Sequence, residues 1–278
     1  NSDSMFPRLT TIRACALAVL ALGHCIQLRA QVPHVTLFDL STSPGLIERA
    51  DRAYRNGDAA KSIDLLEGAL ASAPEDVEAL WRATRASVAL GLLAPNWSLE
   101  EGWYRKGIAL SDEALRLDPT HTEAKRWSVA AKGQIAVSAA PGETARLAQE
   151  IWDVTHDLLA RDPDDGFAHH ALGVLHYEVM KLSRFKRFLA RTFFGNEALS
   201  QASWENAMYH HERAISVQPE AIAYRVAFAE TLMHRDRMPE AIEHLRRAVS
   251  LPILHPGDPD FTALADRYLN ELGADGND

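Results

Sequence analysis

The sequence predicts an all-α protein, built as an α-solenoid of stacked helical hairpins. Three observations predict this fold class. Beyond Gly45, apolar residues recur at intervals of three and four positions, as they do on one face of a helix. Alternating runs typical of strands do not occur in this part of the sequence. A phrase consisting of an Ala-rich helix end followed by a proline returns five times.

The repeated phrase marks the ends of successive helices. Alanine allows two helices to approach closely, and proline ends one helix while suiting the first turn of the next. Each hairpin leaves an apolar face that only the next hairpin can cover, so the units must stack. The five copies occupy residues 69–74, 114–119, 158–163, 214–219 and 248–252. A further helix is expected after each of the first four, over 78–90, 122–138, 166–181 and 221–234.

Three segments resemble the tetratricopeptide repeat (TPR). Residues 53–63 place Gly57 in a turn between helices, residues 240–248 have the pattern of a second helix, and residues 171–173 (Ala-Leu-Gly) suit a tight helix crossing. The resemblance implies an α-solenoid of TPR-like hairpins, and a generic array of helical hairpins is the alternative. Because the spacing between prolines mostly exceeds the family period of roughly 34 residues, insertions are expected around 91–102, 139–144 and 181–203.

A narrower resemblance covers residues 161–272. It depends on Lys181-Leu182-Ser183, Ala190, Thr192 and Phe194-Gly195, on the helix at 207–217, on 161–163 leading into 167–173, and on Leu251-Pro252 before a final helix. This set resembles the regulator of microtubule dynamics family, whose TPR carries the same kind of insertion. The resemblance implies a non-enzymatic binding protein. It also implies association with microtubules or organelle membranes, and some related repeat domains bind phospholipids.

The N-terminus has the layout of a secretory signal peptide. Arg8 and Arg13 give a basic start, residues 14–22 are apolar and uncharged, and Ala30 suits the position before a cleavage site. An uncleaved anchor and a buried helix are the alternatives. Export predicts a periplasmic or secreted protein, with membrane association as a further option. Microtubules are absent from such compartments in bacteria, so the binding scaffold is the part of the resemblance that transfers.

The domain organisation follows from these patterns. We expect a signal peptide over residues 1–31, a linker over 32–45 and a TPR-like α-solenoid over 46–273. The solenoid should contain about five helix pairs and a C-terminal capping helix. Both cysteines, Cys15 and Cys25, lie inside the expected signal peptide, so the mature chain would have no disulfide and no thiol nucleophile.

Composition and motifs argue against two function classes. The net charge of −9 makes a nucleic-acid partner unexpected on electrostatic grounds. The sequence has no Gly-x-Ser-x-Gly, no phosphate-binding Gly-x-x-x-x-Gly-Lys and no Gly-x-Gly-x-x-Gly. We therefore expect a binding protein without a catalytic site or a cofactor.

The insertion at 181–194 is basic and aromatic. As a helix it would place Leu182, Phe185, Leu189 and Phe193 on one face and its arginines on another. Such a helix can lie on an anionic membrane or bind an acidic partner. The alternative is an apolar stripe packed on the solenoid, with the arginines solvated or paired. The candidate patch consists of Lys181, Arg184, Phe185, Arg187, Phe188 and Arg191.

Histidines cluster on two expected helices: His169, His170 and His176 on one, His210 and His211 on the other. His169 and His176 are seven positions apart, so they share a helix face. No standard metal-binding spacing accompanies them. Surface and groove positions are therefore expected, and no metal site.

A concave groove is the leading candidate binding site. In TPR arrays the first helix of each pair lines the concave side, and a cationic, partly aromatic groove would favour a carboxylate, a phosphate or a peptide C-terminus. The partner is expected to be a protein or peptide, with anionic lipid as the alternative through the insertion. The candidate groove residues are Trp81, Arg85, Lys125, Lys132, His170 and Tyr177.

Overall fold

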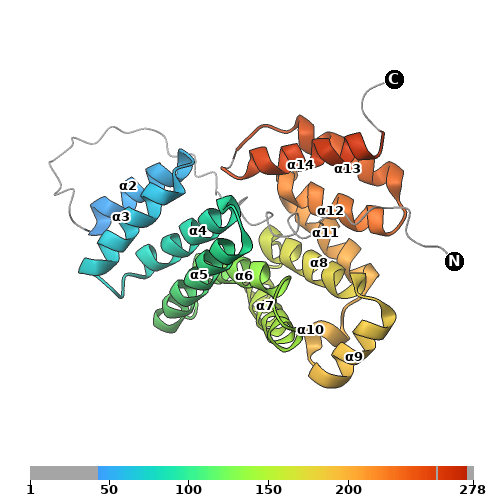
Figure 1. Cartoon of the computed structure of the whole chain (residues 1–278), viewed down its shortest axis with the longest axis horizontal. Helices are drawn as coiled ribbons and strands as arrows, with labels where there is room; N and C mark the ends of the chain where they lie inside the picture. Colours follow the sequence, from blue (N-terminus) through green and yellow to red (C-terminus); the bar gives the residue numbers. More distant parts are fainter. Residues whose placement is uncertain (1–42, 255, 274–278) are drawn as a thin grey trace.

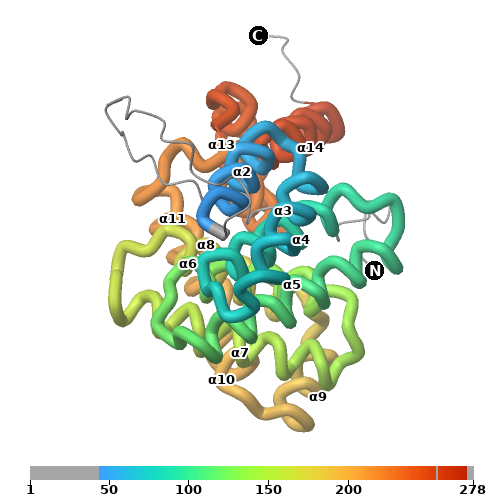
Figure 2. Tube along the Cα trace, turned by 90° about the vertical axis from the view of Figure 1, so that its left-hand side faces the viewer, coloured from blue at the N-terminus to red at the C-terminus, as the bar shows by residue number. Residues whose placement is uncertain are grey.

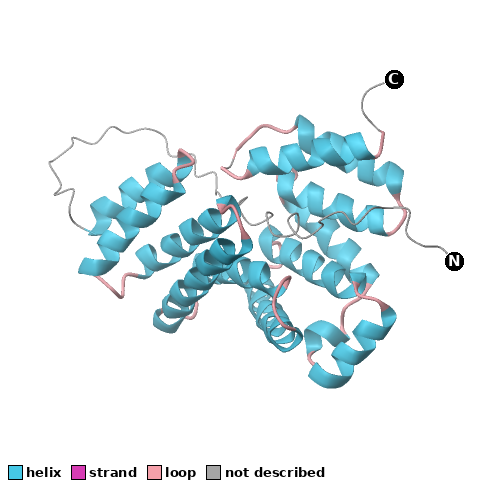
Figure 3. Cartoon of the chain, viewed as in Figure 1, coloured by secondary structure: helices cyan, strands magenta, loops and turns pink. Residues whose placement is uncertain are grey.

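The computed structural model describes residues 43–254 and 256–273, and this part of the chain is helical without strands (Figure 3). The expected signal peptide and most of the expected linker lie outside the described residues. The helices are α2 (Ser43–Arg55), α3 (Ala59–Ser72), α4 (Val77–Leu93), α5 (Trp97–Leu117), α6 (Thr122–Ala136), α7 (Pro141–Arg161), α8 (Gly166–Lys181), α9 (Arg184–Phe194), α10 (Glu197–Ser200), α11 (Trp204–Val217), α12 (Ile222–His234), α13 (Met238–Ser250) and α14 (Asp258–Glu271).

The helices pack as hairpins that follow one another in an arc, from α2 and α3 to α13 and α14 (Figure 1). The pairs are α2 with α3, α4 with α5, α6 with α7, α8 with α11, and α12 with α13, and α14 packs on the last pair. Helices α9 and α10 are inserted between the two helices of the fourth pair and lie together at one edge of the molecule (Figure 2). The predicted all-α solenoid is confirmed.

The turns after each hairpin show how the repeated phrase works. At three of the four turns, all but Ala221 after Pro219, the side chain two positions after the proline caps the next helix: Asp76 Oδ1 accepts from the Glu78 N–H at 3.0 Å, and Asp165 Oδ1 accepts from the Ala168 N–H at 2.9 Å. His121 does the same through its ring Nδ1. These caps satisfy backbone donors that a helix start leaves unpaired. The helix breaks are confirmed near Pro74, Pro119, Pro163 and Pro219.

In four of the five copies of the phrase, one alanine lies where helices touch, whereas Ala160 of the third copy is exposed. Ala69, Ala114, Ala214 and Ala248 are completely buried. At the fourth hairpin the approach is closer still, because a Cβ added at Gly173 of α8 would fall 2.8 Å from His211 Nδ1 of α11. Small residues thus set the spacing within the hairpins, as expected from the sequence.

Two of the three expected insertions took a different form. The segments 91–102 and 139–144 contribute to longer helices, since α5 and α7 each have 21 residues. Only 181–203 adds new elements, α9 and α10. Long spacing between prolines can come from extended helices as well as from loops, and the sequence pattern did not separate the two.

Candidate functional site

The first helix of the insertion, α9, rests on the solenoid without burying a side chain, whereas α10 buries Ala198 and Leu199. Helix α9 begins after Ser183, whose Oγ accepts from the Lys186 N–H at 3.3 Å. It ends at Gly195, which adopts a left-handed conformation with φ of 37°. None of the side chains in α9 is buried. Three faces of this helix have different roles.

The first face anchors α9 through arginines. Arg187 Nη1 donates to the carbonyl of Met180 at 2.6 Å and to that of Leu182 at 3.0 Å. Arg191 Nε donates to the carbonyl of Leu199 at 2.9 Å. These carbonyls lie at or near the ends of α8 and α10, which favour cations. Two of the predicted patch residues therefore hold the insertion in place, with Arg187 half-buried and Arg191 still exposed.

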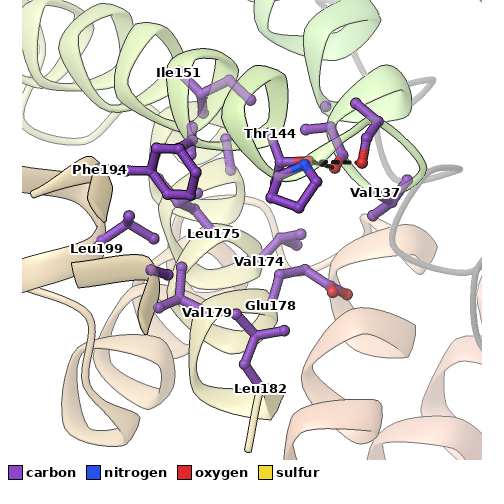
Figure 4. Close-up of a pocket in the computed structure, with 18 of the residues that line it drawn as sticks. Val137, Thr144, Ile151, Val174, Leu175, Glu178, Val179, Leu182, Phe194 and Leu199 are labelled. Carbon is purple, nitrogen blue, oxygen red and sulfur yellow. Dashed lines mark hydrogen bonds between the residues drawn. The ribbon is translucent and has the colours of Figure 1, made fainter. Parts of the chain in front are cut away.

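The second face lines a cavity of about 650 Å³ between α6, α7, α8 and the insertion. In the view of Figure 4, Phe194 and Leu199 lie on one side of the cavity, Val137 and Thr144 on the other, and Leu175 between them. The residues that α9 contributes are Lys186, Leu189, Ala190, Phe193 and Phe194, which share one side of the helix.

The third face points to solvent. Phe185 and Phe188 are 69% and 64% exposed. Arg184 is also exposed, whereas Lys181 is paired with Glu178 at 2.7 Å. The predicted apolar stripe is therefore divided: Leu189 and Phe193 line the cavity, and Phe185 lies outside it.

The six candidate groove residues lie on the first helices of their pairs: Trp81 and Arg85 on α4, Lys125 and Lys132 on α6, His170 and Tyr177 on α8. Five of these side chains are buried, and Arg85 is only partly exposed. The structure brings together Trp81 and Arg85, with the guanidinium 5.3 Å from the indole centroid. His170 instead stacks on Tyr224, with ring centroids 4.4 Å apart.

The cations of this set already have carboxylate partners. Arg85 Nη2 lies 2.5 Å from Asp51 Oδ1, and Lys125 pairs with Asp157. Lys132 Nζ lies 3.0 Å from one carboxylate oxygen of Asp112 and 3.0 Å from one of Glu150. The inner charge of the solenoid is thus largely compensated within the protein. Ligand binding by these residues stays a prediction.

The histidines form a buried contact between α8 and α11. His169 Nε2 lies 3.0 Å from the Pro163 carbonyl, so this nitrogen must donate. When the ring is neutral, its Nδ1 accepts from His210 Nδ1 at 2.9 Å. His176 stacks on His210 with centroids 5.6 Å apart, so His169 and His176 share a face, as expected. The expected surface positions are wrong, however, since His169, His170, His176 and His211 are all buried, while the groove position of His170 stays a prediction.

Burial keeps several of these rings neutral. It lowers the pKa of His170 to about 3. Burial, together with repulsion from His156, lowers the pKa of His176 to about 4. For His210, burial and then the neighbouring His176, His169 and His156 lower the pKa to about 3. Desolvation disfavours the charged imidazolium, so these groups pack as polar aromatic rings.

Two further searches of the described residues give negative results. No group of three or more His, Cys, Asp or Glu residues in 43–254 and 256–273 is arranged to hold a metal ion. Within the same part of the chain, no helix combines the length and apolar content needed to cross a bilayer.

Sequence reasoning missed the cavity. A signal was present in α6 and at its C-cap, where Ala130, Gly133 and Val137 follow one another at helical spacing. These three residues line the cavity, and a Cβ added at Gly133 would meet no atom within 4 Å. A small residue that faces no neighbouring helix leaves an unfilled space. A small residue at a helix crossing instead lets the two helices approach closely, so that no space remains between them.

Comparison with known proteins identifies similar sequences and folds. A family model described as regulator of microtubule dynamics protein 1-3 matches residues 46–273. A TPR protein of Thermus thermophilus, TTC0263, has a TM-score of 0.59 and 17% identity over 82% of this chain and 99% of its own. Residues 41 to the end of MamA from Desulfovibrio magneticus RS-1 have a TM-score of 0.46 and 20% identity over 78% and 97%. No curated protein matches the sequence. The Thermus structure shows the TPR-like fold.

Proposed function

Because the chain belongs to the regulator of microtubule dynamics protein 1-3 family, we propose that it is a non-enzymatic helical scaffold that holds a partner protein. The TPR-like fold supports this proposal, since stacked hairpins provide extended surfaces for binding. We propose further that the outer face of α9, defined by Arg184, Phe185 and Phe188, is the contact surface.

One observation carries this choice of surface. Phe185 and Phe188 expose 69% and 64% of their area to solvent on the side of α9 that does not line the cavity, whereas Phe193, which is 73% exposed, lies on the cavity side. Exposed clusters of apolar residues mark interaction sites, and aromatic residues and arginine are enriched at the centre of interfaces. The neighbouring Arg184 favours a partner segment that is apolar and acidic.

The test compares two double variants in affinity capture from the source cells. Phe185→Ser with Phe188→Ser should lose the specific partner, because the aromatic anchors are gone. The matched control is Ile253→Ser with Leu254→Ser, which removes side chains of similar exposure (52% and 51%) from the connection between α13 and α14. Retention of the same partner by both variants would contradict the proposal.

The sequence favoured a different binding site, the concave groove, with a peptide or an anionic ligand bound in it. For Lys132 or Lys125 to bind it, the ligand's anionic group would have to replace a carboxylate of the protein. Titration with a peptide that ends in a free carboxylate, compared between the parent protein and Lys132→Gln, tests this version. Equal affinities would exclude Lys132 from the binding site.

Contact with an anionic membrane is the second candidate, favoured by the exposed aromatic face beside basic residues on α9. Co-sedimentation with phosphatidylglycerol vesicles at low salt would support it, provided that Phe185→Ser with Phe188→Ser abolishes the binding. The localisation that accompanies both candidates is periplasmic or secreted, on the strength of residues 1–31. Cell fractionation with N-terminal sequencing of the mature protein would test this part.

A further inference from the structure

We propose that the partner bound by the outer face of α9 is a second copy of this chain. The copy would present the turn between α4 and α5, here called the turn surface, and the aromatic rings of α9 would pack against its apolar side chains. This inference rests on the proposed function, because it uses the same face of α9 and names the partner that this face binds. The turn surface consists of Leu93, Trp97, Leu99, Glu100 and Glu101.

The turn between α4 and α5 exposes three large apolar side chains. Leu93, the last residue of α4, is 65% exposed, and Trp97 and Leu99 at the start of α5 are exposed as well. Asn96 caps α5, since its Oδ1 accepts from the Leu99 N–H at 3.2 Å. The cap fixes the turn, so that little conformational freedom is lost when a partner binds. Exposed apolar clusters of this kind mark interaction sites.

Carboxylates outnumber cations beside these apolar side chains. Arg105 Nε lies 2.8 Å from Glu101, and its Nη1 lies 3.0 Å from Glu143, so one guanidinium serves two carboxylates. Arg146 reaches Glu143 only at 3.9 Å, and Glu100 adds a third carboxylate in the first turn of α5. The turn surface is therefore apolar and acidic, and it complements the aromatic and basic outer face of α9.

The two surfaces do not cover each other within one chain. Phe185, Phe188 and Leu93 are all more than half exposed. Helix α9 packs on α7 and α10, and it lies away from the pair formed by α4 and α5 (Figures 1 and 2). Contact therefore requires a second molecule. Because the two surfaces differ, the contact is heterologous, and copies add head to tail until the array closes into a ring or grows as a filament.

The experiment is sedimentation equilibrium of the full chain at about 0.15 M salt, which screens the long-range repulsion between two acidic chains. The average mass of the parent protein should rise with concentration. Phe185→Ser with Phe188→Ser, and separately Leu93→Ser with Leu99→Ser, should each stay monomeric, and both should fold because the four side chains are exposed. A parent protein that stays monomeric, or assembly by either variant, would overturn the proposal.

Mixing the two double variants tests whether the contact joins two different surfaces. The first variant keeps the turn surface and the second keeps the outer face of α9, so the mixture should form a complex that neither variant forms alone. The complex should stop at two chains, because each chain retains one competent surface. Absence of a complex, or growth beyond two chains, would contradict a heterologous contact.

Single residues test the pairing of charges. Arg184→Gln should raise the dissociation constant of the assembly by about threefold, as is typical of an exposed ion pair. Lys186→Gln on the same helix is the matched control, because Lys186 lines the cavity and does not belong to the outer face. Equal weakening by the two variants would overturn the role of Arg184. Ile253→Ser with Leu254→Ser should assemble like the parent protein, and loss of assembly in this variant would overturn the choice of surfaces.

Failure of this inference and failure of the proposed function give different results. If the parent protein stays monomeric while Phe185→Ser with Phe188→Ser still loses another captured protein, the second copy is excluded and the outer face of α9 remains the contact surface. If that variant retains both assembly and every captured protein, the contact surface itself is wrong.

Discussion

Gly173 of α8 lies directly against the ring of His211 of α11. A Cβ at position 173 would fall 2.8 Å from Nδ1 and 2.9 Å from Cε1 of that histidine. His211 is itself fixed, because its Nε2 lies 3.1 Å from the Thr231 hydroxyl of α12. One glycine therefore sets the spacing of the fourth hairpin and, through His211, its contact with the fifth.

Gly173→Ala should destabilise the protein. The gain in helix propensity, up to about 1 kcal/mol, is outweighed by overpacking against a buried ring, which costs about 1–3 kcal/mol. The free energy of unfolding in urea measures the net loss. The matched control is Gly102→Ala in α5, where no atom lies within 4 Å of the added Cβ and a small gain in stability is expected. Equal stability of the two variants would refute the steric argument.

Acid should weaken the fold between about pH 6.5 and pH 4. The folded pKa of His170 is about 3, below its ordinary value of 6.5, so the unfolded chain takes up a proton that the folded chain excludes. Stability is thus retained above pH 6.5 and falls with pH by about 1.4 kcal/mol per unit for each such histidine. Denaturation in urea at pH 7 and pH 5 measures the difference. His170→Phe should reduce this dependence, and an unchanged dependence in that variant would contradict the assignment.

Asp165→Ala should be among the most damaging single changes. Asp165 is buried, caps α8 and accepts from Arg126 Nη2 of α6 at 2.9 Å. Removing one member of a buried ion pair costs about 3–5 kcal/mol. Asp58→Ala is the control, since Asp58 caps α3 by accepting from the Lys61 N–H at 2.9 Å but is exposed, and a cap alone contributes about 1 kcal/mol. Thermal unfolding of both variants should show the difference, and similar midpoints would exclude a large contribution from the Arg126 pair.

Arg191→Ala should loosen the insertion without destabilising the solenoid. Arg191 donates to backbone carbonyls after α9, and these hydrogen bonds add to the packing of Ala190 in holding a helix that buries no side chain completely. Amide hydrogen exchange in residues 184–194 should accelerate, while global unfolding changes little. Arg184→Ala on the same helix serves as the comparison, because Arg184 faces solvent. Unchanged exchange for Arg191→Ala would contradict the anchoring role.

The hairpin array was predictable because its signals are local. Pro119 and the buried Ala114 lie five positions apart, and together they mark a helix end and a helix contact by steric rules that apply to any sequence. The turn at Gly57 is confirmed by its φ of 80°, which favours glycine. The narrower family resemblance is confirmed by the model match over residues 46–273.

The sequence did not predict that the cations of the candidate groove are already paired with carboxylates, because these partners lie far away in the sequence. Arg85 and Asp51 are 34 positions apart, and Lys125 and Asp157 are 32 apart. Their pairing depends on how neighbouring helices pack on one another, which the spacing of residues along one helix does not contain. The division of α9 into three faces likewise depends on where Arg187 finds carbonyl acceptors at the end of α8.

The polar contacts between successive hairpins differ from one junction to the next. Arg85 meets Asp51 at the first, Lys132 meets Asp112 at the second, Arg126 meets Asp165 at the third, and His211 meets Thr231 at the fourth. The hairpins are therefore not interchangeable parts. Shuffling, duplicating or deleting one of them would leave charged side chains next to residues that cannot pair with them. An engineered scaffold would therefore have to keep the two contacting residues of each junction together.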